Sequence, residues 1–264
     1  MERLRHLARA GAVEHRVLVR ESVPALAALV RDSGALVLSC RRLLQHHPGS
    51  GPLAWLCARI LCGEDPRSEA WRCAGEIDDD ATAEHLASEL PEVARVVVLG
   101  WPEVSVAALA RRGDVSSLIV DVEGVDARGG EGAELAYQLQ GIDLDAAEVA
   151  EAGMAAAVRS ADLVVLEAAA LGPDAFVAVS GSYAAAAVAR YAGVPVWLVA
   201  GVGRALPPGL WAGMARRLER PEPWMSTDEI VPLDLVDVVV RPTGRMSGAA
   251  VAGPPDCPDA PELR

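Results

Sequence analysis

A Ser-Gly-Ser step in the second half of the chain has the residue types and the position that could hold an anion. Ser180, Gly181 and Ser182 follow a short apolar run and open an Ala-rich segment, an order that predicts the start of a helix. The first turn of a helix presents unbonded backbone N–H groups at its positive dipole end, where phosphate binds readily. The step therefore predicts either a phosphate site or no more than a helix cap.

The elements that must position this step are alternating strands and helices. Near-continuous apolar runs at 163–166 and 196–200 are typical of strands that helices cover on both faces. The alternation predicts an α/β fold with right-handed crossovers and a Rossmann-like, mostly parallel, doubly wound sheet. We expect strands at 96–99, 117–122, 147–150, 163–167 and 196–200, and helices at 103–111, 132–139 and 154–159.

Residues that directly follow the predicted strands are the next candidates, because ligands of such sheets bind beyond the carboxyl ends of the strands. Gly100 and Trp101 follow the first strand, and Trp101 either closes over a ligand or packs in the core. Arg128 lies in a Gly-rich loop, where it is either a phosphate clamp or a plain surface arginine. Together with the Ser-Gly-Ser step, these residues make up the predicted binding site.

The chain divides into three predicted parts. Residues 1–90 are expected to be a helical region, 91–245 the Rossmann-like domain and 246–264 a flexible tail rich in Gly, Ala and Pro. Within the first part, the polar stretch 64–82 is expected to be a solvated linker that caps the next helix. Within the second, 201–227 is expected to be irregular.

The composition argues against several classes of protein. A net charge of −13 makes a basic surface for nucleic acid improbable. No apolar run reaches the roughly 18 residues of a membrane span, and the first residues do not resemble a secretory signal, so we expect a cytoplasmic protein. The chain has no lysine, so a phosphate clamp must use arginine, hydroxyls or backbone. The five cysteines form no CxxC pair, and we expect neither a metal nor a cofactor.

Three stretches, in the same order along the chain, carry a family resemblance. They are RGGEG at 128–132 with the residues up to 142, the core 161–182 followed by GVPV at 193–196, and DEIVP at 228–232 with the residues up to 244. These stretches resemble the translation initiation factor 2B family, which includes regulatory α, β and δ subunits. The family also includes methylthioribose-1-phosphate isomerase and ribose-1,5-bisphosphate isomerase. The resemblance implies a helical region before a Rossmann-like domain, and a homodimer or larger assembly.

The residues that serve catalysis in the family's isomerases are not found at the matching positions. Their cysteine lies in the turn after the first sheet strand, and here the turn at 99–105 contains none. Their aspartate corresponds to Ala169. We therefore expect a family-like protein that binds a phosphorylated sugar or nucleotide, has no isomerase activity, and acts as a regulatory protein or a subunit.

Two alternatives stay open. In the first, the chain is an aldose–ketose sugar-phosphate isomerase in which Glu167 works with Glu103 or Glu151 as substitute acid and base. The structural explanation of Glu167 is that it caps a helix or pairs with an arginine. In the second alternative, the chain is a structural subunit that pairs with a catalytic paralogue.

Overall fold

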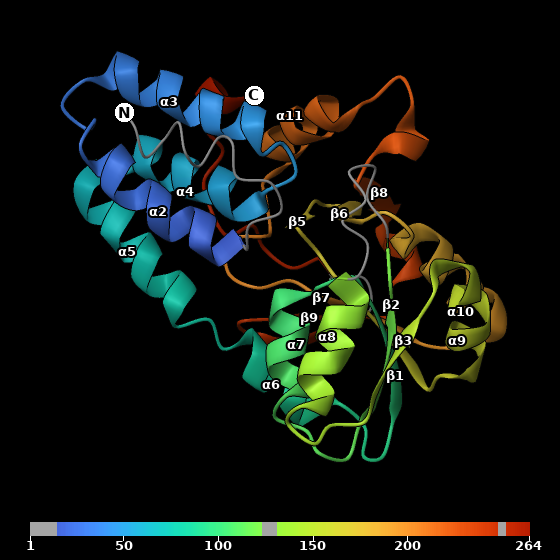
Figure 1. Ribbon diagram of the computed structural model, residues 1–264. Helices are drawn as coiled ribbons and strands as arrows, with labels where there is room; N and C mark the ends of the chain where they lie inside the picture. The colour runs from blue at the N-terminus through green and yellow to red at the C-terminus, as the bar shows by residue number, and fades with distance from the viewer. Residues whose placement is uncertain (1–14, 123–130, 248–251) are drawn as a thin grey trace.

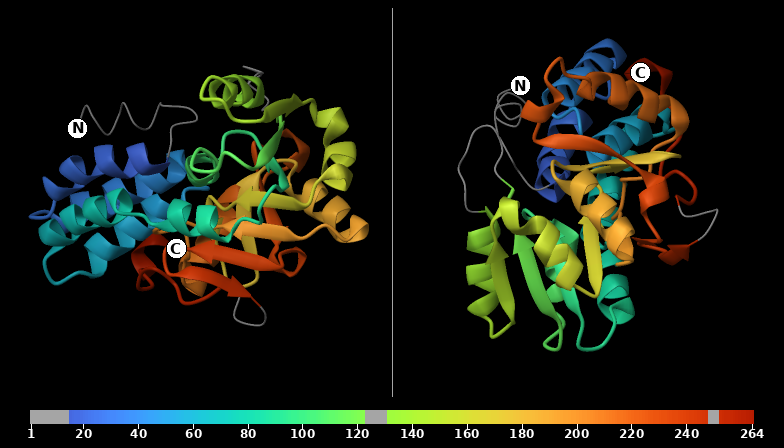
Figure 2. Two further views of the ribbon diagram at one scale, coloured as in Figure 1. Left: turned by 90° about the horizontal axis from the view of Figure 1, so that it is seen from below. Right: turned by 90° about the vertical axis from the view of Figure 1, so that its right-hand side faces the viewer.

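The computed structural model describes residues 15–122, 131–247 and 252–264, and it places a layer of helices at one end of an α/β layer (Figure 1 and Figure 2). Buried side chains fill more than one face of α4, among them Leu53, Trp55 and Leu56, because the other helices surround it. The structure thus confirms that helices precede the sheet. The helical layer consists of α2 (His15–Ala27), α3 (Ser33–His46), α4 (Gly51–Cys62) and α5 (Pro66–Asp78).

Helix α5 occupies most of the stretch 64–82, so the prediction of a linker there was wrong. The Asp65 carboxylate accepts hydrogen bonds from the backbone N–H groups of Arg67 and Ser68, and Pro66 takes the first helical position. One face of α5 buries Cys73 and Ile77 against the other helices. The many charged residues on the outer face concealed this apolar spacing.

The main sheet has the strand order β10-β9-β7-β4-β1-β2-β3 in the described part of the chain. Neighbouring strands are parallel, apart from the antiparallel pair of β9 and β10. This confirms the predicted mostly parallel sheet. The strands are β1 (Arg95–Leu99), β2 (Ser116–Val120), β3 (Ala146–Val149), β4 (Leu163–Glu167), β7 (Val196–Val199), β9 (Val238–Arg241) and β10 (Gly244–Ser247).

Helices cover both faces of this sheet. Val96 and Val98 of β1 pack against α6 (Thr82–Glu89), α7 (Glu103–Leu109) and α8 (Glu131–Gln140). Val97 and Leu99 face the opposite side, where α9 (Met154–Ser160) and α10 (Ser182–Ala192) contribute the buried side chains. Successive side chains of a strand point to opposite faces, so a strand buried on both sides must be apolar throughout.

A second sheet and one helix lie outside the predicted alternation, and the short apolar run before the Ser-Gly-Ser step forms one strand of that sheet. A second sheet consists of β5 (Ala170–Leu171), β6 (Ala175–Val179) and β8 (Asp228–Pro232), in antiparallel pairs. Helix α11 (Pro208–Leu218) lies within the stretch 201–227 that was expected to be irregular. Proline at the first position of a helix needs no partner for its missing N–H, so the proline there starts the helix instead of breaking it.

The last residues of the chain differ from the flexible tail that the sequence predicted. Strand β10 pairs with β9, and the segment 252–264 then returns to the helical layer. Cys257, Ala260 and Leu263 are buried there against the helices. A composition rich in Gly, Ala and Pro conceals these apolar anchors, because they are few and far apart. No helix among the described residues is both long and apolar enough to cross a membrane.

Candidate functional site

The Gly100 turn after β1 and the Ser-Gly-Ser step after β6 lie close together, although β6 belongs to the small antiparallel sheet. Both Gly100 and Gly181 have positive φ, at 59° and 98°. A Cβ on Gly100 would lie 3.1 Å from Val122 Cγ2, and one on Gly181 would lie 3.5 Å from Val122 Cγ1. The two glycines therefore approach the same valine, and a side chain at either position would be strained. The sequence placed both segments after predicted strands, but the strand before the Ser-Gly-Ser step lies outside the parallel sheet.

The Ser-Gly-Ser step starts α10, as predicted, but its hydroxyl groups do not cap the helix. Gly181 is the N-cap residue, Ser182 is buried, and the hydroxyl of Ser180 donates to the carbonyl of Ser226 over 2.6 Å. In the first turn, the N–H of Tyr183 donates to Glu229 Oε1 over 2.8 Å. A carboxylate from β8 thus already satisfies one donor at the positive end of this helix.

Two further amides of this turn have no such partner. Within the part of the chain that the structure describes, no acceptor is bonded to the N–H groups of Ser182 and Ala184. Among the other predicted binding residues, Trp101 is half-buried and packs against the core under α7. Arg128 lies outside the described residues.

The carboxylate of Glu167, at the end of β4, is fully engaged by the start of α7. Its Oε2 accepts from the N–H of Val104 at 3.0 Å and from the N–H and hydroxyl of Ser105, both at 2.9 Å. Its Oε1 lies 3.0 Å from Nη1 of Arg204. Glu167 therefore caps one helix and pairs with one arginine, the two structural roles that its position after a strand suggested.

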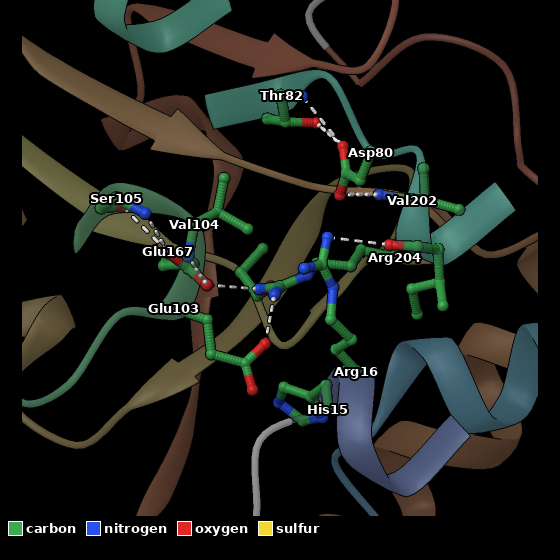
Figure 3. A network of polar contacts seen from close by, with 12 residues as sticks. His15, Arg16, Asp80, Thr82, Glu103, Val104, Ser105, Glu167, Val202 and Arg204 are labelled. Atoms are coloured by element: carbon green, nitrogen blue, oxygen red, sulfur yellow. Dashed lines mark hydrogen bonds and ion pairs between the residues drawn. The ribbon is translucent and has the colours of Figure 1, made fainter. Parts of the chain in front are cut away.

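Arg204 is the centre of this network, and sequence reasoning missed it. Its side chain is only 4% exposed, and its guanidinium lies between Glu167 and Glu103, 3.4 Å from the Oε2 of Glu103 (Figure 3). It also donates to the carbonyl of Ala168. The available signal was its position shortly after the buried strand β7, at the same edge of the sheet as the other candidates.

Helix α2 brings two more basic residues to Arg204. Figure 3 shows His15 and Arg16 beside its guanidinium. His15 Nδ1 lies 3.0 Å from Ser50 Oγ, and Arg16 Nη2 donates to the carbonyl of Ile77 over 3.0 Å. Burial, followed by the positive charges of Arg204 and His47, lowers the pKa of His15 to about 3. His15 is therefore neutral in the folded protein at physiological pH.

Asp80 connects the helical layer with the loop after β7. One carboxylate oxygen accepts from the N–H of Thr82 over 2.9 Å, at the start of α6. The other accepts from the N–H of Val202 over 3.0 Å, two residues before Arg204. A Cβ on Gly201 would come within 2.4 Å of the same oxygen, so this position requires glycine. The acidic residue thus holds the Arg204 loop in place.

Clustered metal-ligating side chains and the cysteine thiols are the remaining candidate groups. These residues contain no group of three or more His, Cys, Asp or Glu side chains that could hold a metal ion. Cys40, Cys57 and Cys73 are buried in the helical layer. A hydrogen bond with Cys40 and burial raise the pKa of Cys57 well above its ordinary value, so that this thiol stays protonated.

Several solved structures share this arrangement of elements, whereas no family model and no curated protein matches the chain. A translation initiation factor eIF-2B from Pyrococcus horikoshii OT3 matches with a TM-score of 0.77 and 14% identity, over 93% of this chain and 96% of that one. The eIF2B beta subunit from Chaetomium thermophilum gives 0.70 and 16%, over 96% and 89%. The 5-methylthioribose 1-phosphate isomerase from P. horikoshii OT3 gives 0.64 and 15%, over 94% and 84%.

These likenesses extend over most of each chain and confirm the resemblance at the level of the fold. The chain has the fold that initiation factor 2B subunits share with a sugar-phosphate isomerase. The matches cover both the helical layer and the parallel sheet of this chain, because they extend over more than nine-tenths of it. At this level of identity the fold does not decide between the roles of subunit and enzyme.

The lowered pKa of His15 predicts a loss of stability in acid. The unfolded chain binds a proton at this histidine below about pH 6.5, whereas the folded chain does so only near pH 3. The contribution of His15 to the free energy of unfolding is therefore fully present above pH 6.5, and it is lost as the pH drops toward 3. Urea unfolding between pH 7 and pH 4 should show a shallower loss for His15→Gln than for the wild type. His46→Gln, at an exposed histidine, should leave the slope unchanged; identical slopes for all three proteins would contradict the prediction.

Proposed function

We propose that this protein binds a phosphorylated sugar or nucleotide at the carboxyl edge of its sheet and does not catalyse aldose–ketose isomerisation. Its role is then that of a regulatory protein or a subunit. The observation that carries the proposal is the state of Glu167, which is the best substitute for the missing catalytic aspartate. Its oxygens are engaged by helix α7 and by Arg204, as described above.

Proton transfer by Glu167 would disrupt the network around it. A general base must give up hydrogen bonds to its charged form when it takes a proton. For Glu167, that step would remove the negative charge that α7 and the buried Arg204 both require. Losing that charge would leave the guanidinium of Arg204, at 4% exposure, with less compensation, which is costly.

The Ser-Gly-Ser step supports the binding half of the proposal. The amides of Ser182 and Ala184 point from the first turn of an eleven-residue helix, where the dipole favours an anion. Gly100 and Gly181 let the backbone of both turns approach Val122 closely. The Glu229 carboxylate accepts a hydrogen bond from the adjacent N–H group of Tyr183. Its negative charge repels a second anion and so weakens the binding of phosphate.

Glu229 and Gly181 provide the test of binding. We expect ribose 5-phosphate or AMP to raise the melting temperature of the wild type. Glu229→Gln should lower Kd about three- to tenfold, because it removes a negative charge next to the phosphate. Gly181→Ala should raise Kd, since its Cβ would approach Met154 Cε to 3.2 Å.

Gly193→Ala is the matched control, because Gly193 also has a positive φ, 72°, but a Cβ there meets nothing within 4 Å. It should cost about 1 kcal/mol of stability and leave Kd unchanged. The same sugar phosphates should show no isomerisation by NMR. No binding by the wild type, or measurable turnover, would contradict the proposal.

We further propose that the protein forms homo-oligomers through the face that α10 and β8 share. Strand β8 is at the edge of the small sheet, and Ile230 on it is exposed. Tyr183, Tyr191 and Trp224 are exposed nearby along α10 and before β8, which leaves an apolar surface. Sedimentation velocity should give at least the mass of a dimer, and Ile230→Glu should reduce it. Tyr137→Glu, at an exposed residue of α8, should not; a monomeric wild type would disprove the proposal.

A further inference from the structure

Four arginines line a cavity of about 300 Å³ between α3, α11 and the end of the chain. Arg41 comes from α3, Arg216 and Arg217 from the last turn of α11, and Arg264 from the final segment. Figure 1 shows the C-terminus beside α3 and α11. None of the residues discussed at the carboxyl edge of the sheet lines this cavity. Such a concentration of positive charge is unexpected in a chain with a net charge of −13.

The protein neutralises little of this charge. Arg264 pairs with Asp259, which among the described residues is the one carboxylate in an ion pair with any of the four arginines. Arg41 donates to the carbonyl of Glu262 over 2.6 Å, and Arg217 donates to the carbonyl of Leu263 over 3.1 Å. A carbonyl satisfies an N–H group but carries no net charge. The arginines therefore outnumber the carboxylates that pair with them, and positive charge is in excess at the cavity.

Arg217 shows most clearly that the cavity lacks negative charge. Its Nε and Nη2 atoms are buried and have no hydrogen-bond partner. Burial, followed by the charge of Arg216, lowers the pKa of Arg217, which is the direction expected when no carboxylate compensates the guanidinium. Buried donors without a partner are rare in native proteins, because each one costs free energy. Arg217 also lines the cavity, so an anion bound there would supply the negative charge that its guanidinium lacks.

We propose that this arginine cavity is a second anion site, which binds a small molecule carrying a phosphate or diphosphate group. Guanidinium groups bind phosphate through paired N–H donors, and the planar fork of Arg217 still has both Nε and Nη2 to offer. Leu44 and Leu263 add apolar surface for an organic group attached to the phosphate. The cavity lies at the lower end of the volumes that small-molecule sites have.

Because the cavity lies against the last residues of the chain, an anion bound in it would also affect how firmly those residues are held. Leu263 is buried against the helical layer, and the arginines of the cavity hold the carbonyls of Glu262 and Leu263. A bound anion would lower the repulsion between Arg216 and Arg217 and so secure the final segment. The ligand therefore stabilises the end of the chain as well as filling the cavity.

Calorimetric titration with inorganic pyrophosphate, at constant ionic strength, tests the proposal. We expect saturable binding to the wild type and a rise in Kd of about tenfold or more for Arg217→Gln, because a charge-assisted hydrogen bond is lost. Arg216→Gln should weaken binding as well. Arg220→Gln is the matched control, since Arg220 is exposed shortly after α11 and does not line the cavity.

Two further measurements keep the outcome decisive. Circular dichroism checks that Arg217→Gln is folded, and Arg216→Gln serves as the test if it is not, because Arg216 is exposed. Gly181→Ala should bind pyrophosphate as the wild type does, so a failure at the sheet edge and a failure at this cavity are distinguishable. The proposal would be overturned if the titration of the wild type showed no saturation. It would also be overturned if Arg217→Gln and Arg220→Gln had equal Kd values for pyrophosphate.

Discussion

The buried guanidinium of Arg204 is the interaction on which the arrangement of this protein depends. A positive charge at 4% exposure is tolerated only when carboxylates and carbonyls surround it. Glu167 at the end of β4, Glu103 at the start of α7 and the carbonyl of Ala168 supply that compensation. The loop after β7, the end of β4 and the first turn of α7 are thereby fixed to one another, and His15 and Arg16 of the helical layer lie against the same group.

This constraint bears directly on the candidate acid–base residues at the edge of the sheet. Ala169 stands where the resemblance places a catalytic aspartate, and the neighbouring carboxylate of Glu167 is committed to a helix and an arginine. The same edge of the sheet has two glycines with positive φ and the amides that open α10. Those features suit the binding of an anion and require no proton transfer.

The sequence predicted the elements whose apolar residues are continuous or evenly spaced. The run at 163–167 became β4 at the same residues, because its first four positions form one continuous buried apolar run. Helix α5 was missed because its charged outer face outweighs the buried Cys73 and Ile77. The final segment was missed because three separated anchors, Cys257, Ala260 and Leu263, give no periodic signal. Arg204 could not be recognised, since neither its burial nor its two carboxylate partners, 37 and 101 residues away, show in local sequence.

A double-mutant cycle on Glu167 and Arg204 tests most directly whether their pair is structural. We expect Glu167→Gln and Arg204→Gln each to lower the free energy of unfolding by about 3–5 kcal/mol, because each leaves a buried charge without its partner. The double mutant should lose less than the sum, with a coupling of about 1–3 kcal/mol. The exposed pair of Arg111 and Glu84 serves as the control and should couple by less than about 1 kcal/mol. Additive losses at Glu167 and Arg204, or unchanged stability with altered turnover of a sugar phosphate in Glu167→Gln, would contradict the structural role.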